Sequence, residues 1–131
     1  MSQVIEEKEQ KFDTLKNRSD FLRVAGMRQK WVTPAMIIQV LSNRNNDSEE
    51  VRVGYTASKK VGNAVQRNFA KRRMREVAKK VFPNKAKEGH DYVLIARREI
   101  SEYPFNELIR DLKWALKRLH EGLDAKKGGA N

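Results

Sequence analysis

The chain has 131 residues, with 28 lysines and arginines against 17 aspartates and glutamates, so its net charge is +11 and its pI is near 10.1. This length predicts one domain around a single core, and the charge favours RNA or DNA as partner rather than lipid, because no apolar run could span a bilayer. Cysteine is absent and the acidic N-terminus lacks an apolar signal core, which excludes a disulfide framework and leads us to expect a cytoplasmic protein without a membrane anchor.

The N-terminal part predicts a tail and a short helix. Residues 1–13 are polar and have no periodic apolar pattern, so we expect a flexible tail. Asn17 or Ser19 can cap a helix that continues to about Ala25 and ends at Gly26.

Two strands are predicted next. Residues 31–41 are rich in β-branched and large apolar side chains, and residues 51–58 alternate apolar with polar side chains, the period of a strand with one dry face. The polar segment 42–47 predicts a loop between them, so we interpret the two strands as a hairpin.

A strongly basic stretch follows the second strand. Residues 59–80 hold nine basic residues and one acid, which is a net +8 of the total +11. Strong helix formers, and the absence of proline between residue 59 and Pro83, predict a helix from near Gly62 or Asn63 to Lys80, with Pro83 breaking the chain after it.

Helical spacing divides this stretch into two faces. Apolar side chains fall within one narrow arc, and basic or amide side chains gather on the opposite side. The first set is Ala70, Met74, Val77 and Val81, and the second is Asn68, Lys71, Arg72, Arg75 and Lys79. A solvated helix face usually mixes both signs of charge, because like charges three or four residues apart repel. The single sign therefore predicts a polyanionic partner, and arginine, which binds phosphate oxygens in pairs, favours nucleic acid.

The C-terminal part completes the predicted fold. Residues 92–97 predict a third strand and residues 105–119 an amphipathic helix with Trp114 in the core, while residues 121–131 predict a flexible tail. The single domain is thus expected over residues 14–120. Its predicted class is α+β, a two-layer sandwich in which helices cover a small, mostly antiparallel sheet.

Four segments resemble one protein family. The run VRVGYTASKKVGNAVQRNFAKRRMRE, residues 51–76, resembles the signature of the bacterial ribonuclease P protein subunit, a strand and a Lys-Lys turn followed by Arg-Asn-Arg and Lys-Arg elements on a helix. The segments LKNRSDFLRVAGMR, GHDYVLIARREI and FNELIRDLKWALKRL resemble the family's first helix, last strand and last helix, so the resemblance covers about residues 15–119. It implies a left-handed β-α-β crossover, an exception to the usual hand.

The resemblance also implies a function. The family's enzyme removes the 5′ leader of precursor transfer RNA by RNA- and magnesium-dependent endonucleolytic cleavage, which gives the mature 5′ end. The implied partners are the catalytic RNA and the precursor transfer RNA, bound by a monomeric protein, one per RNA. Magnesium is implied as the cofactor, held mainly by the RNA, which carries the chemistry while the protein positions both RNAs.

Matching positions imply two sets of contact residues. The set for the catalytic RNA is Lys59, Lys60, Asn63, Arg67, Asn68, Lys71, Arg72 and Arg75, with Gly62 shaping the turn before the helix. The set for the leader is Phe21, which matches the aromatic of the family's Asp-Phe pair, with Arg28 and Gln39 as weaker candidates. Phe69 stands where the family has a second arginine, and Ala25 where it often has a second aromatic residue.

No catalytic constellation is visible in the chain. His90 and His120 are isolated, and neither a metal-binding spacing nor a nucleophile motif occurs, so we expect no catalytic residue and no metal site in the protein itself. This pattern argues against a self-sufficient nuclease. The alternative is a ribosomal or ribosome-assembly protein, which would show the same basic helix and bind RNA without a nuclease role.

Overall fold

The computed structural model describes residues 11–26, 29–42 and 49–128, so the predicted leader contact Arg28 lies outside the described residues. The elements in chain order are β1 (Asp13–Thr14), α1 (Arg18–Gly26), β2 (Lys30–Val32), β3 (Met36–Ser42), β4 (Arg52–Thr56), α2 (Ala64–Lys85), β5 (His90–Ala96), the 3₁₀ helix η1 (Arg98–Ser101) and α3 (Phe105–Gly128). The α+β class is confirmed, and the first helix begins and ends within a residue or two of its prediction.

The strands form one mixed sheet in the order β1-β4-β5-β3-β2. β3 is antiparallel to β2 and to β5, whereas β4 is parallel to β1 and to β5. The sheet is therefore less antiparallel than we predict from the sequence. Because β4 and β5 are parallel neighbours joined through α2, they form a β-α-β crossover. Its left hand stays a prediction.

The predicted single strand over residues 31–41 is wrong, because the chain reverses at Thr33 and Pro34. Thr33 donates its backbone N–H to the carbonyl of Met36 over 2.8 Å, and its side-chain hydroxyl donates to the same carbonyl over 2.7 Å. Proline favours such a turn and cannot donate to a strand ladder. The segment is thus the β2–β3 hairpin.

The predicted hairpin between residues 31–41 and 51–58 is also wrong, since β5 lies between β3 and β4. β5 buries side chains on both faces, Tyr92 and Leu94 on one and Val93 on the other. Apolar side chains on both faces are typical of a central strand. Strands β3 and β4, which follow each other in the sequence, are therefore not neighbours in the sheet.

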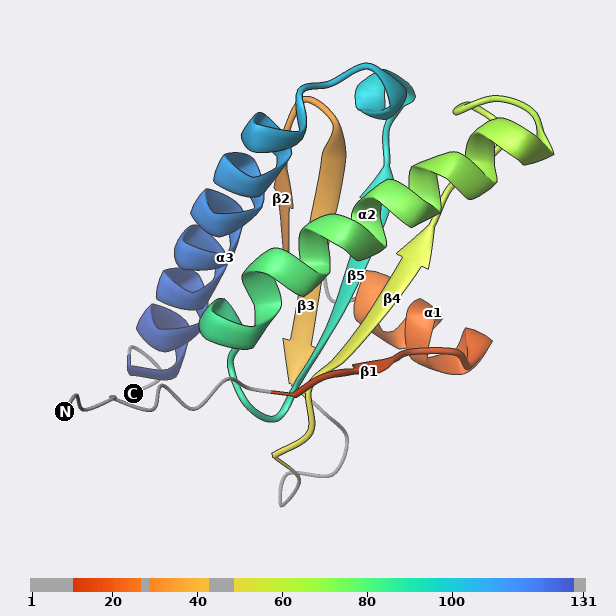
Figure 1. Ribbon diagram of the computed structural model, residues 1–131. Coiled ribbons are helices and arrows are strands. Elements are labelled where there is room, and N and C mark those ends of the chain that lie inside the picture. The colour runs from red at the N-terminus through yellow and green to blue at the C-terminus, as the bar shows by residue number, and fades with distance from the viewer. Residues whose placement is uncertain (1–10, 27–28, 43–48, 129–131) are drawn as a thin grey trace, which may run out of the picture.

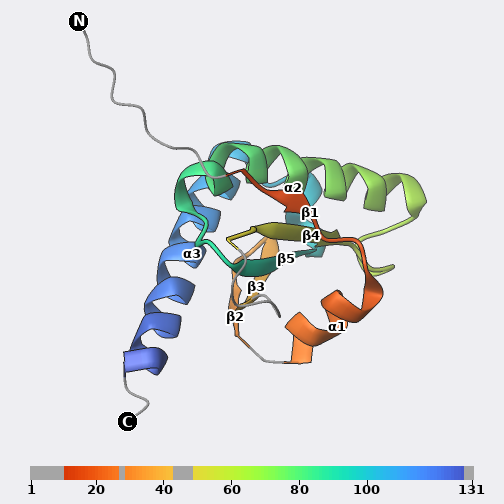
Figure 2. The same ribbon diagram turned by 90° about the horizontal axis from the view of Figure 1, so that it is seen from below.

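The helices cover opposite faces of this sheet. α2 and α3 cover one face, where Met36, Ile38 and Val40 of β3 join the main core, and α1 lies on the other (Figures 1 and 2). A smaller cluster lies beneath α1, with Leu15 and Val24 buried against the sheet. The face of the sheet that bears α1 is consequently only partly covered, so part of it remains open beside this helix.

Helix α2 begins as predicted but ends later. Asn63 accepts a hydrogen bond from the N–H of Gln66, whose side chain accepts one from the N–H of Asn63, a complete capping box. Pro83 does not break the helix, which continues to Lys85. Phe82, next to this proline, is fully buried, and its carbonyl accepts the N–H of Ala86 over 2.9 Å, so packing in the last turn offsets the lost donor.

Described elements extend into the ranges predicted as tails at both ends of the chain. Helix α3 continues to Gly128, whereas the sequence predicts that this helix ends at residue 119. At the other end Asp13 pairs with β4, and the ring of Phe12 lies 5.6 Å from that of Phe82, while residues 1–10 lie outside the described residues. Trp114, predicted as a core residue, is instead 50% exposed on α3.

Candidate nucleic-acid interface

The two faces predicted for the basic helix are confirmed in α2. The apolar stripe Ala70, Met74, Val77 and Val81 is fully buried against the sheet and α3. On the other side Asn68, Arg72, Arg75 and Lys79 are exposed, and Arg67 and Lys71 are half-buried. We call these six residues the basic face of α2. The nearby acid Glu76 pairs only loosely with Lys79, over 3.8 Å, so the face keeps its positive charge.

Arg73 does not belong to this face, although the run of basic residues is continuous in the sequence. Its guanidinium donates to the carbonyls of Ile100 and Tyr103, the latter over 2.8 Å, and lies 5.9 Å from the ring of Phe105. These contacts attach η1 and the start of α3 to α2. Arg73 is therefore a structural residue, and Arg72 next to it is exposed.

The turn before α2 presents two further cations. Lys59 and Lys60 are exposed, and Gly62 has a φ of 146°, a conformation that side chains disfavour. A Cβ at Gly62 would come within 2.0 Å of the capping side chain of Gln66. Arg67 then donates to the carbonyl of Gly62 over 3.1 Å, so glycine, cap and arginine fix the turn together.

Arg75 is held in place by an aromatic ring. Its guanidinium lies 5.5 Å from the ring centre of Tyr55 on β4, within cation–π range. Burial raises the pKa of Tyr55 to about 12, and the charge of Arg75 lowers it less strongly. Tyr55 thus stays neutral at physiological pH and supports an exposed cation.

Phe69 and Val65 form an apolar step beside the basic face. Val65 is 76% exposed and Phe69 is 42% exposed, one turn apart on α2. Phe69 stands where the family resemblance implies an arginine, and its ring is accessible from solvent. The substitution consequently exchanges a phosphate-binding group for a surface on which a base can stack.

Of the predicted leader residues, Phe21 and Gln39 lie on the face of the sheet that bears α1. Ladder pairing places Gln39, Val93 and Gly54 in one row across β3, β5 and β4. The ring of Phe21 lies against Gly54 so closely that a Cβ there would come within 2.4 Å of it. Phe21 is therefore half-buried at one end of the row, and Gln39 is half-buried further along it.

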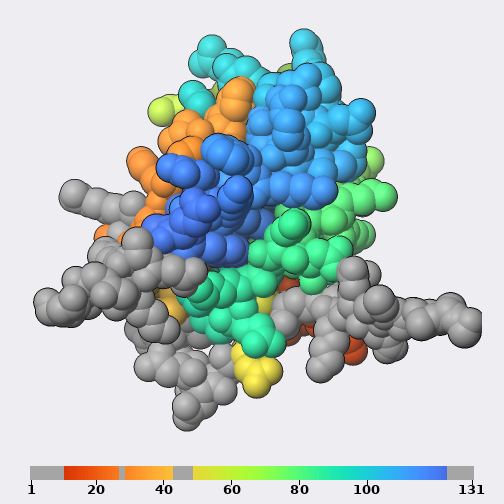
Figure 3. Space-filling model, turned by 90° about the vertical axis from the view of Figure 1, so that its left-hand side faces the viewer, coloured from red at the N-terminus to blue at the C-terminus, as the bar shows by residue number. Residues whose placement is uncertain are grey.

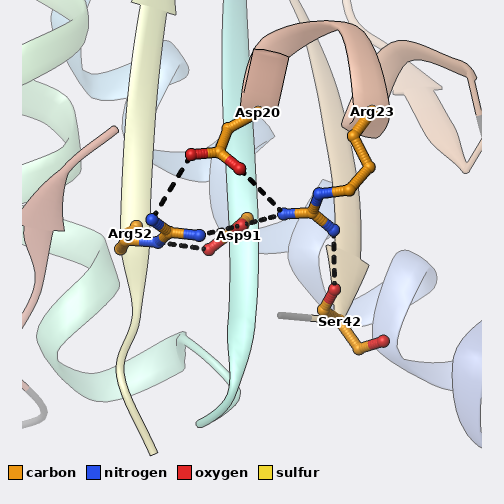
Figure 4. Close-up of polar contacts among 5 residues, drawn as sticks. All are labelled: Asp20, Arg23, Ser42, Arg52 and Asp91. Carbon is orange, nitrogen blue, oxygen red and sulfur yellow. Dashed lines mark hydrogen bonds and ion pairs between the residues drawn. The ribbon is translucent and has the colours of Figure 1, made fainter. Parts of the chain in front are cut away.

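Helix α1 is connected to the sheet by a network of charged side chains that no sequence pattern indicates (Figure 4). The carboxylate of Asp91 is fully buried and accepts hydrogen bonds from Arg23 of α1 and from Arg52 of β4, the latter over 2.9 and 2.7 Å. Asp20 lies 3.6 Å from Arg23 and 3.5 Å from Arg52. The hydrogen bonds that Arg52 donates to Asp91, and then the negative charge of Asp91, raise the pKa of Arg52 against the opposing effect of burial.

The part of this face beyond α1 is hollowed. A depression of about 420 Å³ is lined by Ile37, Ser58, Lys60, Ile95, Ala96, Arg97, Arg98 and Glu99. Ile37 pairs with Ile95, next to the row that contains Gln39. The hollow also includes Ser58 and Lys60 of the turn before α2, so the partly open sheet face and the basic face of α2 meet at this turn.

Other kinds of site find less support in the described part of the chain. It contains no group of three or more His, Asp or Glu side chains that could hold a metal ion. None of its helices is both long and apolar enough to cross a membrane. Asp111 accepts a hydrogen bond from the hydroxyl of Tyr103 over 2.6 Å, far from Asp91 in the sequence and in a separate contact.

The fold and the basic face together define an α+β domain with a helical surface of one charge sign, a class of surface typical of RNA-binding proteins. The ribonuclease P family model matches residues 10–120. The chain is 50% identical over 111 residues to the ribonuclease P protein component of Paramagnetospirillum magneticum, covering 83% of this chain and 84% of that protein. It is 47% identical over 107 residues to that of Ruegeria pomeroyi, with 81% and 85% covered.

Solved structures agree with these sequence matches. The ribonuclease P protein of Thermotoga maritima superposes with a TM-score of 0.67 at 26% identity, covering 80% of this chain and 96% of that one. That of Staphylococcus aureus superposes with a TM-score of 0.65 at 28% identity, covering 79% and 92%. The chain belongs to the ribonuclease P protein family, and it is accordingly a component of that enzyme.

Proposed function

We propose that this chain binds the catalytic RNA of ribonuclease P through the basic face of α2 and the turn before it, and binds the 5′ leader of precursor transfer RNA on the sheet face beside α1. In this way it assists endonucleolytic removal of the leader to give the mature 5′ end. The observation that carries the proposal is the exposed, single-signed face of α2, with Arg72 and Arg75 directed away from the core.

The basic face suits a folded RNA. Each phosphate that a lysine or arginine neutralises releases counterions, which makes the affinity fall steeply with salt. Asn68, with a donor and an acceptor, can bind sugar or base edges between the charged contacts. The repulsion among like charges on α2 is relieved only when such a polyanion is bound, so the face stabilises the complex more than the free protein.

The sheet face suits a single strand. Single-stranded nucleic acid is bound by aromatic rings beside cations that follow its backbone. Phe21 offers a half-buried ring at one end, Gln39 an amide on the floor, and Lys60 a cation in the adjoining hollow. The leader would thus leave this face next to the turn that starts the basic helix, which brings the two RNAs together.

Position and charge are what this protein contributes to the reaction. Magnesium activates water and stabilises the leaving oxygen in such cleavages. The described residues of this chain form no ligand cluster for it, so the proposal assigns magnesium mainly to the RNA. The protein would act as a monomer in the cytoplasm, one copy for each RNA, lowering the repulsion between catalytic and precursor RNA.

Cleavage of precursor transfer RNA at low magnesium tests this function. Three reactions are compared: the protein alone, the ribonuclease P RNA of the same organism alone, and the two together. We expect efficient cleavage only in the combination. No stimulation of the RNA by the protein would favour a ribosomal role instead, and cleavage by the protein alone would reveal catalytic residues in the chain.

A further inference from the structure

Helix α3 carries an exposed tryptophan on a side of the molecule that the function proposed above does not use. Trp114 is 50% exposed, opposite the buried Leu108, Leu112 and Leu119 of the same helix. Figure 3 shows α3 along the middle of this side, with the C-terminal end of α2 beside it. A large aromatic ring half in water forgoes much of the stabilisation that burial would give.

Cations surround this ring. The amine of Lys117 lies 5.5 Å and the guanidinium of Arg118 5.7 Å from the ring centre of Trp114. Arg118 also lies 5.6 Å from the ring centre of Trp31 on β2, so one guanidinium contacts both tryptophans of the chain. These contacts restrain the indole of Trp114 before any partner arrives.

A hollow of about 520 Å³ adjoins the indole, lined by Lys85, Arg110, Lys113, Trp114, Leu116, Lys117, His120 and Glu121. The acids near it are already paired: Glu107 and Asp111 with Arg110, and Glu121 with Arg118. Within the described residues, Lys85, Lys113 and Lys117 form no ion pair. Among the described residues, three lysines without an ion pair therefore lie around this aromatic ring.

We propose that this outer face of α3 is a second RNA-binding surface, on which Trp114 stacks on an unpaired base while Lys85, Lys113 and Lys117 contact the flanking phosphates. An accessible ring with cations on several sides is the combination that binds single-stranded nucleic acid without strict sequence preference. The proposal deepens the proposed function, on which it rests for the nature of the partner.

The centre of this surface lies apart from Arg72, although Lys79 at the end of the basic face is nearer to it. Lys85 lies 13 residues beyond Arg72 on the same helix, which places them about 20 Å apart along its axis. An RNA bound at Arg72 therefore does not reach Trp114 through the same phosphates. The two surfaces offer two contacts to one folded RNA, or contacts to two RNAs.

Tryptophan fluorescence tests the proposal directly, because Trp114 lines the hollow and Trp31 is the only other tryptophan of the chain. In a Trp31→Phe variant of the full chain, Trp114 is the only tryptophan, and excitation at the red edge of its absorption band avoids the three tyrosines. Titration with an unstructured single-stranded RNA of about 12 nucleotides should quench its emission to saturation, as stacking requires. The wild-type chain is titrated in parallel, and its emission should be quenched over the same RNA concentrations.

Variants that remove lysine charges test whether the hollow contributes to the RNA affinity measured by quenching. Lys113→Gln together with Lys117→Gln should weaken the RNA affinity measured by quenching at least about fivefold. Lys16→Gln is the matched control: it removes an exposed cation just before α1, outside both proposed RNA-binding surfaces, and should leave the affinity measured by quenching of Trp114 unchanged.

Three results would decide against the surface. Emission from Trp114 that is unchanged by RNA would exclude stacking, and equal affinity in the lysine variants would exclude the phosphate contacts. Emission that changes with protein concentration alone, together with a dimer in sedimentation, would assign the face to a second copy of the chain. If quenching occurs while the protein fails to stimulate cleavage, the proposed function fails and this surface stands.

Discussion

At the scale of single residues, Arg72 and Arg73 are neighbours in sequence with opposite roles. Arg72 is exposed on the basic face of α2, whereas Arg73 donates to the carbonyls of Ile100 and Tyr103. Arg72→Ala should weaken binding of the catalytic RNA and reduce the slope of log affinity against log salt by about one. Arg73→Ala should instead lower the free energy of unfolding by about 1–3 kcal/mol and leave the salt slope unchanged. Binding titrations at several salt concentrations and urea unfolding separate the two effects, and an unchanged slope in Arg72→Ala would remove the phosphate contact.

Phe21 shows how a residue can serve both packing and binding. Its ring covers Gly54, so Phe21→Ala would disturb α1, and Phe21→Leu is the better test because it keeps an apolar contact there. If the ring stacks on the leader, Phe21→Leu should weaken the binding of precursor transfer RNA by about 1 kcal/mol or more and that of mature transfer RNA much less. Equal losses for both RNAs would assign Phe21 to the fold alone.

At the scale of elements, the position of α1 depends on the buried carboxylate of Asp91. Asp91→Asn would leave Arg23 and Arg52 with only the more distant carboxylate of Asp20 as charge partner, and breaking a buried pair costs about 3–5 kcal/mol. We expect faster hydrogen exchange in α1 than in α2 of this variant, because Arg23 connects α1 to Asp91 and α2 makes no such contact. Leu15, Phe21 and Val24 would still hold α1 partly in place. Equal acceleration in both helices would mean that the network stabilises the whole domain rather than α1.

Sequence patterns predicted elements whose information is local. The capping residue Asn63, the apolar stripe and the single-signed face of α2 all lie within one segment, and the structure confirms each. The β2–β3 turn was missed because strand-forming side chains on both sides outweighed Pro34. The Asp91 network was missed for a different reason: its members come from residues 20, 23, 52 and 91, which only the sheet order brings together. The predicted leader contacts beside α1 came from the family resemblance, because residue spacing alone does not indicate them.

At the scale of the whole molecule, all three tyrosines titrate above their ordinary range. Burial raises the pKa of Tyr55 to about 12 and raises that of Tyr92 further, and a hydrogen bond to Asp111 raises that of Tyr103 to about 12. The unfolded chain releases these protons near the ordinary value of 10.0. The three tyrosines therefore make their full contribution to the free energy of unfolding below pH 10, and this contribution is lost as the pH rises from about 10 through 12. For Tyr55 alone the difference corresponds to about 3 kcal/mol.

Urea unfolding at pH 8, 10 and 11 should accordingly give a free energy of unfolding that is lower at pH 11 than at pH 10. Phenolate absorbance in the near ultraviolet should stay low in the folded protein at pH 10 and rise on unfolding, because all three hydroxyls are then released. Tyr103→Phe removes the Asp111 contact and should make the fall in stability shallower without abolishing it, since Tyr55 and Tyr92 still contribute. Phenolate that forms near pH 10 while the chain remains folded would contradict the raised pKa values.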